Sequence, residues 1–505
     1  MNKEYLIDEI EGEDEYSYII NQSGNKNIIY LNRPQSTHFV ANSLCKFLPD
    51  IKSDELEKAC ADLSEYLHKD YLLVNCLRKG IIFHHGSIPD SVRSYVESLY
   101  KRCLDIKFVI TTSTLLEGVN LPAEKMFVLS TFKGNRSLSK SQMKNLIGRV
   151  SRLNDVFASR NLLALIPEIH FVGNRFVRKG TDLLAFVKKT LNENLKIKDK
   201  VENPMLEKSD IDIESDSDLK EEISYLGNID IDIVQESGLN FEISATEAGQ
   251  KCFLNRLTGF NILEREFLIN DSVIEARRMN SLAKDSVSLI EVINHVFLRN
   301  IPSDIISEDD NLIRLRDNFE ARDFYAMILD WRISAMSYPE MISKFLSYWN
   351  KIESDSDKKI IYAGKWGTRN RDEFTKGNFN NYVDISVLNE SERVTLAISR
   401  IEAEMSYLDY HVMKYVECIK SFGLIDLEFY DRLKFGSSNE FTKLLMQSGM
   451  SSTLAKFFTD DYFKQFIKFY PSGVIAIDES VISIMELKEI NGILINEALQ
   501  YVQEI

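Results

Sequence analysis

Short apolar runs alternate with helical stretches over the first third of the chain. The apolar runs are bounded by polar or turn-forming residues, and they predict strands over 27–31, 80–86, 107–112, 125–129 and 162–166. Apolar residues three and four positions apart predict helices between them, over 37–47, 53–67 and 89–103. Strands interleaved with helices at these spacings form right-handed β-α-β units. The pattern therefore predicts an α/β fold with a parallel sheet.

Helical spacing dominates after about residue 240, where it predicts helices over 286–298, 311–344, 391–420 and 440–457. No repeat of fixed period is present. We therefore expect the sheet domain to be followed by mainly α-helical domains. The predicted division is a lead-in over 1–24, the sheet domain over 25–195, an acidic linker region over 196–238, a helical region over 239–345 and a helical C-terminal domain over 346–505.

The composition narrows the class of protein. The 505 residues are 44% apolar and 27% charged, which is typical of a soluble globular protein of about three domains. No apolar run approaches the roughly 20 residues that span a bilayer, so we expect no membrane partner. The six cysteines are scattered without a C-x-x-C pair, and the N-terminus is acidic rather than signal-like. These features predict reduced, mostly buried thiols in a cytoplasmic protein.

The formal net charge of −16 argues against a nucleic-acid binder, but the charge is unevenly distributed. Residues 131–190 hold twelve Lys and Arg against three Asp and Glu, whereas residues 202–236 hold twelve acidic residues against two lysines. We interpret 208–218 as a solvated acidic linker, because like charges oppose compaction. The alternative is an acidic arm that masks the basic segment. A basic surface is therefore compatible with the acidic total.

The stretch 108–123 is the most informative segment. Its strand leads into Thr112, Ser113, Gly118 and Asn120, so hydroxyls and a glycine lie at a carboxyl strand end, where open α/β sheets place ligands. Hydroxyls and backbone N–H groups there can hold phosphate oxygens. The alternative is an ordinary Thr/Ser-rich strand-to-helix cap.

The stretch 145–152 carries two arginines on one predicted helical face. Arg149 and Arg152 are three residues apart, so their side chains are neighbours on a helix. A pair of guanidinium groups can bracket a polyphosphate and stabilise charge on a transferred phosphoryl group. An exposed basic helix face is the alternative.

In this order along the chain, the segments resemble the second motor domain of superfamily two helicases. The likeness is to the branch of the archaeal repair and RNA-exosome helicases. It covers about 25–175 and rests on 79–86 with Arg93 and Glu97, on 112–123, which is similar to motif V, and on 145–152, which is similar to motif VI. The resemblance implies a RecA-like fold for the sheet domain.

The resemblance also implies roles for individual residues. Arg149 and Arg152 would be catalytic, reaching ATP phosphates bound by the first motor domain, with Arg152 as the arginine finger. Nucleotide-binding positions would be Gly118, Asn120, Asn145 and Gly148. Nucleic-acid-binding positions would be Thr112, Ser113, His85 and Gly86. The chain departs from the family at Asn145, where glutamine is usual, and at Ser151, where glycine is usual.

Two motifs of a complete motor are absent from the 505 residues, namely the phosphate loop G-x-x-x-x-G-K-[ST] and the Mg²⁺-binding D-E-x-[DH]. Some 26 residues precede the first predicted strand, too few for a further domain. We therefore expect ATP and Mg²⁺ to bind only jointly with a phosphate-loop-containing first motor domain in another chain. By itself the chain should not hydrolyse ATP.

The C-terminal two thirds resemble the helical tail of bacterial helicases associated with phage defence. By that resemblance 239–345 would be winged-helix-like, and 240–505 would line the nucleic-acid path. Trp331, Trp349 and Trp366 could stack on bases, but we predict packing for each. Likewise Cys76, His84 and His85 could suggest a metal or nucleophile site, but we interpret them as a structural strand end.

Our leading hypothesis is the C-terminal part of an ATP-dependent DNA or RNA helicase that supplies arginine fingers and a strand-binding surface. One alternative is a catalytically inactive nucleic-acid-binding or regulatory protein that keeps the scaffold. Another is a pure protein-interaction scaffold. Retention of both arginines and of the 112–120 segment argues against the last.

Overall fold

The chain forms two compact units, each described here by itself. The first comprises Met1–Glu65 with Lys69–Lys220, and the second comprises Tyr66–His68 with Glu221–Ile505. The computed structural model describes residues 14–114, 121–134, 136–148, 150, 168–178, 180–191, 244–257, 262–300, 315–316, 318–355, 360–363, 382–470 and 475–502.

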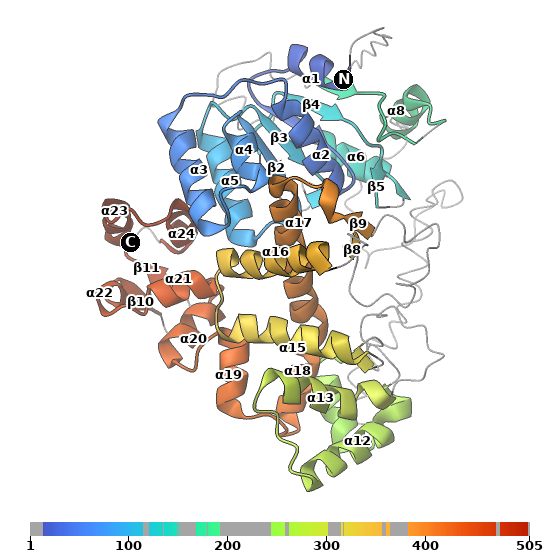
Figure 1. Ribbon diagram of the computed structural model, residues 1–505, viewed down its shortest axis with the longest axis vertical. Coiled ribbons are helices and arrows are strands. Elements are labelled where there is room, and N and C mark those ends of the chain that lie inside the picture. Colours follow the sequence, from blue (N-terminus) through green and yellow to red (C-terminus); the bar gives the residue numbers. More distant parts are fainter. Residues whose placement is uncertain are drawn as a thin grey trace, which may run out of the picture. The chain divides into compact units, whose positions relative to one another are not determined.

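A five-stranded parallel sheet lies at the centre of the first unit (Figure 1). Its order is β2-β3-β1-β4-β7. Strands β1, β2 and β3 are buried along their whole length. In α/β proteins, helices generally cover both faces of the sheet, and such strands are apolar throughout. The strand bounds are β1 Asn27–Tyr30, β2 Ile81–His84, β3 Phe108–Thr111, β4 Lys125–Val128 and β7 Glu168–Phe171.

The predicted parallel sheet is confirmed, with one difference in its strands. Strands β1 to β4 lie within the predicted runs. The fifth strand, however, is Glu168–Phe171, which the apolar pattern did not predict. The predicted strand over 162–166 lies outside the described residues. Glu168 and His170 alternate with apolar residues in β7, so this sheet-edge strand does not read as an apolar run.

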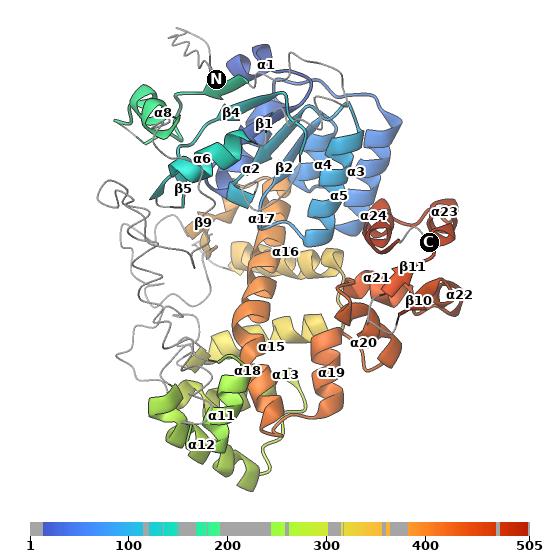
Figure 2. The same ribbon diagram turned by 180° about the vertical axis from the view of Figure 1, so that it is seen from behind.

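Helices surround the sheet in the first unit. Both views place α3, α4 and α5 towards its β2 edge and α6 and α8 towards the opposite edge (Figures 1 and 2). The helices predicted over 37–47, 53–67 and 89–103 are confirmed as α2, α3 and α5, whereas α4 was not predicted. A small hairpin, β5 Phe132–Lys133 with β6 Arg136–Ser137, follows β4. The helix bounds are α1 Glu15–Asn21, α2 Pro34–Cys45, α3 Asp54–Tyr66, α4 Leu72–Leu77, α5 Asp90–Arg102, α6 Lys140–Ile147 and α8 Leu183–Leu191.

A buried lysine fixes the end of α5 against the start of β1. The Lys26 side chain is 8% exposed, and its Nζ donates hydrogen bonds to the carbonyl oxygens of Tyr100 at 2.7 Å and Cys103 at 2.6 Å. It donates a third to Ile106 at 2.8 Å. These carbonyls lie at the C-terminal end of the helix, where the helix dipole favours a cation. Lys26 thereby positions β1 and β3 side by side.

The second unit is mainly helical, and both views show α17 and α18 as a long rod crossed by α15 and α16 (Figures 1 and 2). Tyr325 of α15 joins the rod by donating a 3.0 Å hydrogen bond to Glu404. The longer helices are α11 Glu247–Leu254, α12 Ile262–Arg278, α13 Ser286–Val296, α15 Phe319–Ile333, α16 Tyr338–Asp355, α17 Glu390–Tyr407, α18 Met413–Ser421 and α19 Leu427–Phe435.

The last part of the second unit packs around its own apolar cluster, which includes Leu454, Phe458, Val481 and Met485. Two strand pairs are antiparallel, β8 Ile360–Tyr362 with β9 Tyr382–Asp384, and β10 Ile467–Phe469 with β11 Ile475–Ile477. The helices are α20 Glu440–Gln447, α21 Ser452–Phe457, α22 Asp461–Lys464, α23 Ser480–Leu487 and α24 Gly492–Ala498.

Two long helices expected from the sequence are each broken in two. The helix predicted over 311–344 is α15 and α16, separated at Ala335, whose φ of 47° ends the first helix. The helix predicted over 440–457 is α20 and α21, separated at Gly449, whose φ is 97°. Apolar spacing continues across both breaks, so periodicity alone does not reveal them. The helix over 391–420 is present as α17 and α18, joined by a π-helical turn at Leu408–Val412.

Two of the three tryptophans are buried. Trp331 and Trp349 are each 4% exposed, as their predicted packing role requires, while Trp366 lies outside the described residues. All six cysteines are free and buried. In the described part of the chain, no helix is both long and apolar enough to cross a membrane. The acidic linker region over 196–238 lies outside the described residues, and the division at 345 stays a prediction.

Candidate nucleic-acid interface

The carboxyl ends of β2 and β3 bring the four predicted strand-binding residues to one edge of the sheet. The two strands are parallel neighbours, with His84 paired to Thr111. The Thr112 N–H donates to the His84 carbonyl at 3.4 Å, so the chain segments beyond the two strands stay together. His85 and Gly86 therefore lie beside Thr112 and Ser113. Carboxyl strand ends are where sheets of this class place ligands.

The four residues differ in solvent exposure, and therefore in which of their atoms could contact a ligand. The His85 side chain is fully buried, so its backbone is the part that can contact a ligand. Thr112 is 4% exposed, Ser113 is half-buried and Gly86 is exposed. A Cβ at Gly86 would come no closer than 3.8 Å, to Thr114 Cγ2, so space does not demand glycine here. The edge thus presents backbone amides and hydroxyls rather than charges.

A pair of imidazoles underlies this edge. His38 Nε2, on α2, and His85 Nε2 are 2.7 Å apart. The Ser87 N–H donates to His85 Nδ1 at 3.2 Å, so that nitrogen is an acceptor and the neutral ring carries its proton on Nε2. His85 Nε2 therefore donates to His38, whose own proton is on Nδ1. The hydrogen bond from the Ser87 N–H to His85 thus determines the tautomers of both rings.

Both rings of this pair are held neutral. Burial lowers the pKa of His38 to about 4. Burial also lowers the pKa of His85 well below its ordinary value, and repulsion from His38, His84 and Arg93 lowers it further. Burial removes part of the water that would solvate a cationic ring, so the neutral form of each ring is favoured. The pair is therefore a fixed neutral support for the strand end.

His84 ties β2 to two other segments. Its Nε2 pairs with Glu97 Oε1 of α5 at 2.6 Å, and its Nδ1 pairs with Thr114 Oγ1 at 3.0 Å. Thr114 directly follows the predicted ligand-binding hydroxyls. Sequence reasoning named His84 and Glu97 as parts of one motif but did not foresee that they bond, and it missed His38. A lone histidine in the apolar pattern of α2 was the only signal for His38.

The nucleotide side of the predicted site is described in part. Helix α6 begins with a capping box, in which Ser139 and Gln142 bond each other's backbone N–H groups. Asn145 lies exposed on this helix, and Gly148 is its C-cap. The other predicted residues, Gly118, Asn120, Arg149 and Arg152, lie outside the described residues. The structure thus brings the residues predicted to bind a strand together, and most of the residues predicted to bind a nucleotide lie outside the described ranges.

Cys76 precedes β2, and His84 and His85 lie at its end, where the sequence could also suggest a metal site. Within the described ranges, no group of three or more His, Cys, Asp or Glu side chains is arranged to hold a metal ion. The imidazole nitrogens of His84 face Glu97 and Thr114, and those of His85 face His38 and Ser87. These contacts account for the histidines as structural groups at the end of β2.

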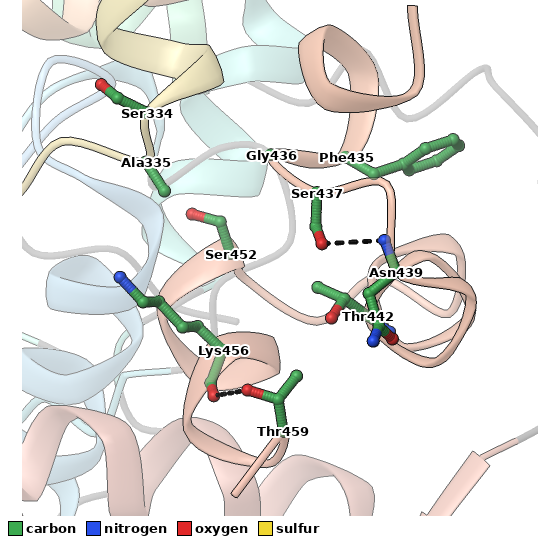
Figure 3. A pocket seen from close by; sticks show the side chains of 10 residues that line it. All are labelled: Ser334, Ala335, Phe435, Gly436, Ser437, Asn439, Thr442, Ser452, Lys456 and Thr459. Atoms are coloured by element: carbon green, nitrogen blue, oxygen red, sulfur yellow. Dashed lines mark hydrogen bonds between the residues drawn. The ribbon is translucent and has the colours of Figure 1, made fainter. Parts of the chain in front are cut away.

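The second unit has a small polar cavity of about 250 Å³ (Figure 3). It lies between the end of α15, the α19–α20 turn and α21, and hydroxyl groups such as those of Ser437, Thr442 and Ser452 line it. Lys456 is the one cation among its described lining residues. Ser437 Oγ accepts a 3.0 Å hydrogen bond from the Asn439 N–H, so part of the lining is already satisfied internally.

Similarity to known proteins is confined to part of the chain, and no protein-family profile matches it. A helicase POLQ-like protein of Drosophila melanogaster is 33% identical over 99 residues, 20% of this chain and 9% of that protein. The ATP-dependent DNA helicase Hel308 of Thermoplasma volcanium is 29% identical over 133 residues, 26% of this chain and 19% of that protein. Anti-bacteriophage protein B of Escherichia coli is 28% identical over 150 residues, 30% of this chain and 18% of that protein.

The chain therefore has homologues among Hel308 and POLQ-like helicases, and in one anti-bacteriophage protein, over a partial stretch of its length. This agrees with a partial superfamily two helicase. The chain spans between 9% and 19% of the length of the three relatives described above.

Proposed function

We propose that this chain supplies the second motor domain of an ATP-dependent nucleic-acid helicase and binds a strand at the carboxyl ends of β2 and β3. One observation carries the proposal. The in-register pairing of His84 with Thr111 places Gly86 beside Thr112 and Ser113, in a chain whose homologues are helicases. The five-stranded parallel sheet fits the RecA-like fold of such a domain.

The chemistry of this edge suits a sugar-phosphate backbone. Backbone N–H groups and hydroxyls bond phosphate oxygens without reading bases, so a strand of any sequence is held alike. The buried histidine pair fixes the positions of these donors, because neither ring changes charge near neutral pH. A motor that moves along a strand needs contacts of this sequence-independent kind.

ATP hydrolysis would require a second domain. We propose that Arg149 and Arg152, just beyond α6, reach the phosphates of an ATP–Mg²⁺ complex, with Gly118, Asn120, Asn145 and Gly148 lining the nucleotide cleft. The 505 residues contain no phosphate loop to hold that nucleotide. The arginines would act on a nucleotide bound by a phosphate-loop domain outside these residues, and we propose that another chain supplies that domain.

A second candidate is a catalytically inactive nucleic-acid-binding protein that keeps the scaffold. Asn145 and Ser151, which stand where the resembled family usually has glutamine and glycine, favour it. Both candidates bind a strand at the same sheet edge. They differ in whether any phosphate-loop partner yields nucleic-acid-stimulated ATP hydrolysis.

Strand binding is tested by fluorescence anisotropy with labelled DNA and RNA 20-mers of matched sequence. Thr112→Val keeps the side-chain shape and removes the hydroxyl, and we expect affinity to fall about fivefold. Thr395→Val, at a threonine of the second unit that is also 4% exposed, is the matched control and should bind normally. Equal affinities for the wild type and both variants would contradict the proposed edge.

The arginine role is tested by ATPase assay with a phosphate-loop partner, sought first among neighbouring genes. Arg152→Ala should reduce strand-stimulated hydrolysis at least a thousandfold, the scale of a lost arginine finger. Arg160→Ala removes a nearby cation outside the motif and should leave the rate unchanged. Hydrolysis that survives Arg152→Ala would remove the assigned role. Absence of hydrolysis with every partner favours the inactive candidate.

We also propose phage defence as the biological setting, on the strength of the relative named anti-bacteriophage protein B. Expression of the chain with its genomic neighbours should lower the plating efficiency of some phages. Arg152→Ala should abolish the protection. Unchanged plating across a diverse phage panel would argue against this setting.

A further inference from the structure

The carboxyl edge of the sheet has a second half, at β1, β4 and β7. The chain leaves β1 towards β2 on one side of the sheet, and it leaves β4 towards β7 on the other. β1 and β4 are adjacent, so their ends form the point where the strand order reverses. Sheets of this class bind ligands in the crevice at such a point. Of the predicted site residues that the structure describes, none lines this crevice.

A cavity of about 440 Å³ occupies this crevice. Segments that follow β1, β4 and β7 line it, among them Arg33, Arg175 and Arg178, together with the polar residues Asn32, Ser36 and Ser130. The described lining includes no acidic residue. Ser130 is 3% exposed, so its hydroxyl is part of a buried wall. The cavity is therefore polar and strongly cationic.

Two asparagines build the walls of this crevice. The Asn32 side chain donates to the Gly134 carbonyl at 2.7 Å and accepts from the Gly134 N–H at 2.6 Å, joining the segment after β1 to the hairpin after β4. Gly134 has a φ of 60°, a conformation that favours glycine. Asn174 donates to the Leu129 carbonyl at 3.1 Å, which fastens the segment after β7 to the end of β4. The crevice is thus a defined structure rather than a gap between loops.

The arginines are placed but electrostatically unpaired. The Arg175 guanidinium lies 3.6 Å from the ring centroid of Phe39 and 5.3 Å from that of Phe176, so it contacts both α2 and the segment after β7. Such stacking leaves the N–H groups at the guanidinium edge available. Across the described ranges, no carboxylate forms an ion pair with Arg33, Arg175 or Arg178, and all three are exposed.

Helix α2 adds a further attraction for an anion. It spans twelve residues, begins at Pro34 and has no side-chain cap at Arg33. Its first backbone N–H groups thus lie beside the arginines, and a helix N-terminus favours negative charge.

We propose that this crevice binds a phosphate group through Arg33, Arg175 and Arg178. Guanidinium forks match phosphate oxygens in charge and geometry. The group belongs either to a nucleic-acid strand or to a free nucleotide or polyphosphate. Thr112 is not among the residues that line the crevice, so the proposal does not depend on the proposed motor function.

The experiment compares two double variants of the full chain by isothermal titration calorimetry. Arg175→Gln with Arg178→Gln removes two crevice cations. Lys188→Gln with Lys189→Gln removes two exposed cations from α8, in the same basic segment, and is the matched control. The ligands are inorganic pyrophosphate, ATP and a single-stranded 20-mer. Circular dichroism melts verify that both variants fold.

We expect the crevice variant to lose about tenfold or more in affinity for at least one ligand, and the control to lose less than twofold. A loss confined to the 20-mer identifies a strand phosphate, and a loss confined to pyrophosphate and ATP identifies a free anion. Equal behaviour of the two variants towards all three ligands overturns the proposal. Thr112→Val should leave pyrophosphate binding intact, so failure of the Thr112 edge and failure of the crevice are distinguishable.

Discussion

At the β2–β3 half of the sheet edge, His84 and His85 are fully buried and their ring nitrogens face other protein groups. At the β1–β4–β7 half, Arg33, Arg175 and Arg178 are exposed and line a cavity. In the first half, the histidine side chains bond other protein groups and stabilise the backbone. In the second half, the arginine side chains are exposed and can contact a ligand. Substitutions of the buried histidines should therefore act on stability, and substitutions of the exposed arginines should act on binding.

The largest expected effect is the loss of the buried ring in His85→Ala. The substitution leaves a cavity and leaves His38 Nε2 without its donor, so we expect the free energy of unfolding to fall by about 3 kcal/mol. Urea denaturation of the full chain, followed by near-ultraviolet circular dichroism, measures it. Arg33→Gln, in the exposed half, should change stability by less than about 0.5 kcal/mol. Equal losses for the two variants would erase the contrast between the halves.

The next effect is acid destabilisation through His38. The unfolded ring gains a proton near pH 6.5, whereas burial holds the folded pKa to about 4. Stability should therefore be complete above pH 6.5 and fall as the pH drops towards 4, because the unfolded chain binds the extra proton. The expected loss from this ring between pH 6.5 and 5 is about 2 kcal/mol.

Urea midpoints of wild type and His38→Gln across this pH range isolate that contribution, since carboxylate titrations are common to both. His411→Gln, in the second unit, is the control for the loss of a histidine elsewhere in the chain. A His38→Gln protein with the same acid slope as wild type would show that the ring is protonated in the folded state.

A smaller effect is expected from Asn174→Ala in the cationic half. Its side chain donates to Leu129 and Val172 and accepts from the Phe176 N–H. We expect a loss of about 1–2 kcal/mol and faster amide exchange over 174–178, with pyrophosphate affinity reduced as Arg175 loses its support. Hydrogen exchange by mass spectrometry measures the opening. Unchanged exchange there, with normal affinity, would show that the asparagine does not hold the crevice.

The smallest effect is expected from Phe39→Leu, which keeps an apolar side chain and removes the aromatic face beneath Arg175. Loss of a cation–π contact at an exposed site is worth about 0.5–1 kcal/mol, so pyrophosphate affinity should fall about two- to fivefold. Calorimetric titration resolves this. Phe47→Leu, another exposed phenylalanine of the first unit, should leave affinity unchanged.

Much of the sheet could be predicted because β1, β2 and β3 are buried along their whole length. Ile28, Ile82 and Val109 lie in unbroken apolar runs for this reason. Strand β7 was not predicted, because its side chains are partly exposed and alternate in polarity. The break at Ala335 escaped because a left-handed alanine leaves no mark in the apolar spacing. The pattern of apolar residues thus predicts burial well, but it predicts local backbone conformation poorly.

Some features of the candidate site could be predicted from the sequence, and others depend on tertiary packing. Thr112 and Gly86 could be found because each is the last residue of a predicted strand, and parallel strands end at one edge. The bond between His38 and His85 joins residues 47 positions apart, so only the packing of α2 on β2 reveals it. Arg175 and Arg178 were visible as charge, but their place in a crevice depends on the order of strands in the sheet.

Photo-crosslinking tests most directly whether the carboxyl sheet edge holds a nucleic-acid strand. A 20-nucleotide strand carrying photoreactive thymidine analogues is irradiated with the full chain, and the crosslinked peptides are mapped by mass spectrometry. We predict crosslinks at 84–87 and 111–114, with further ones at 175–178 if the crevice phosphate belongs to the strand. Crosslinks confined to the second unit, at strand concentrations that saturate binding, would contradict the assignment.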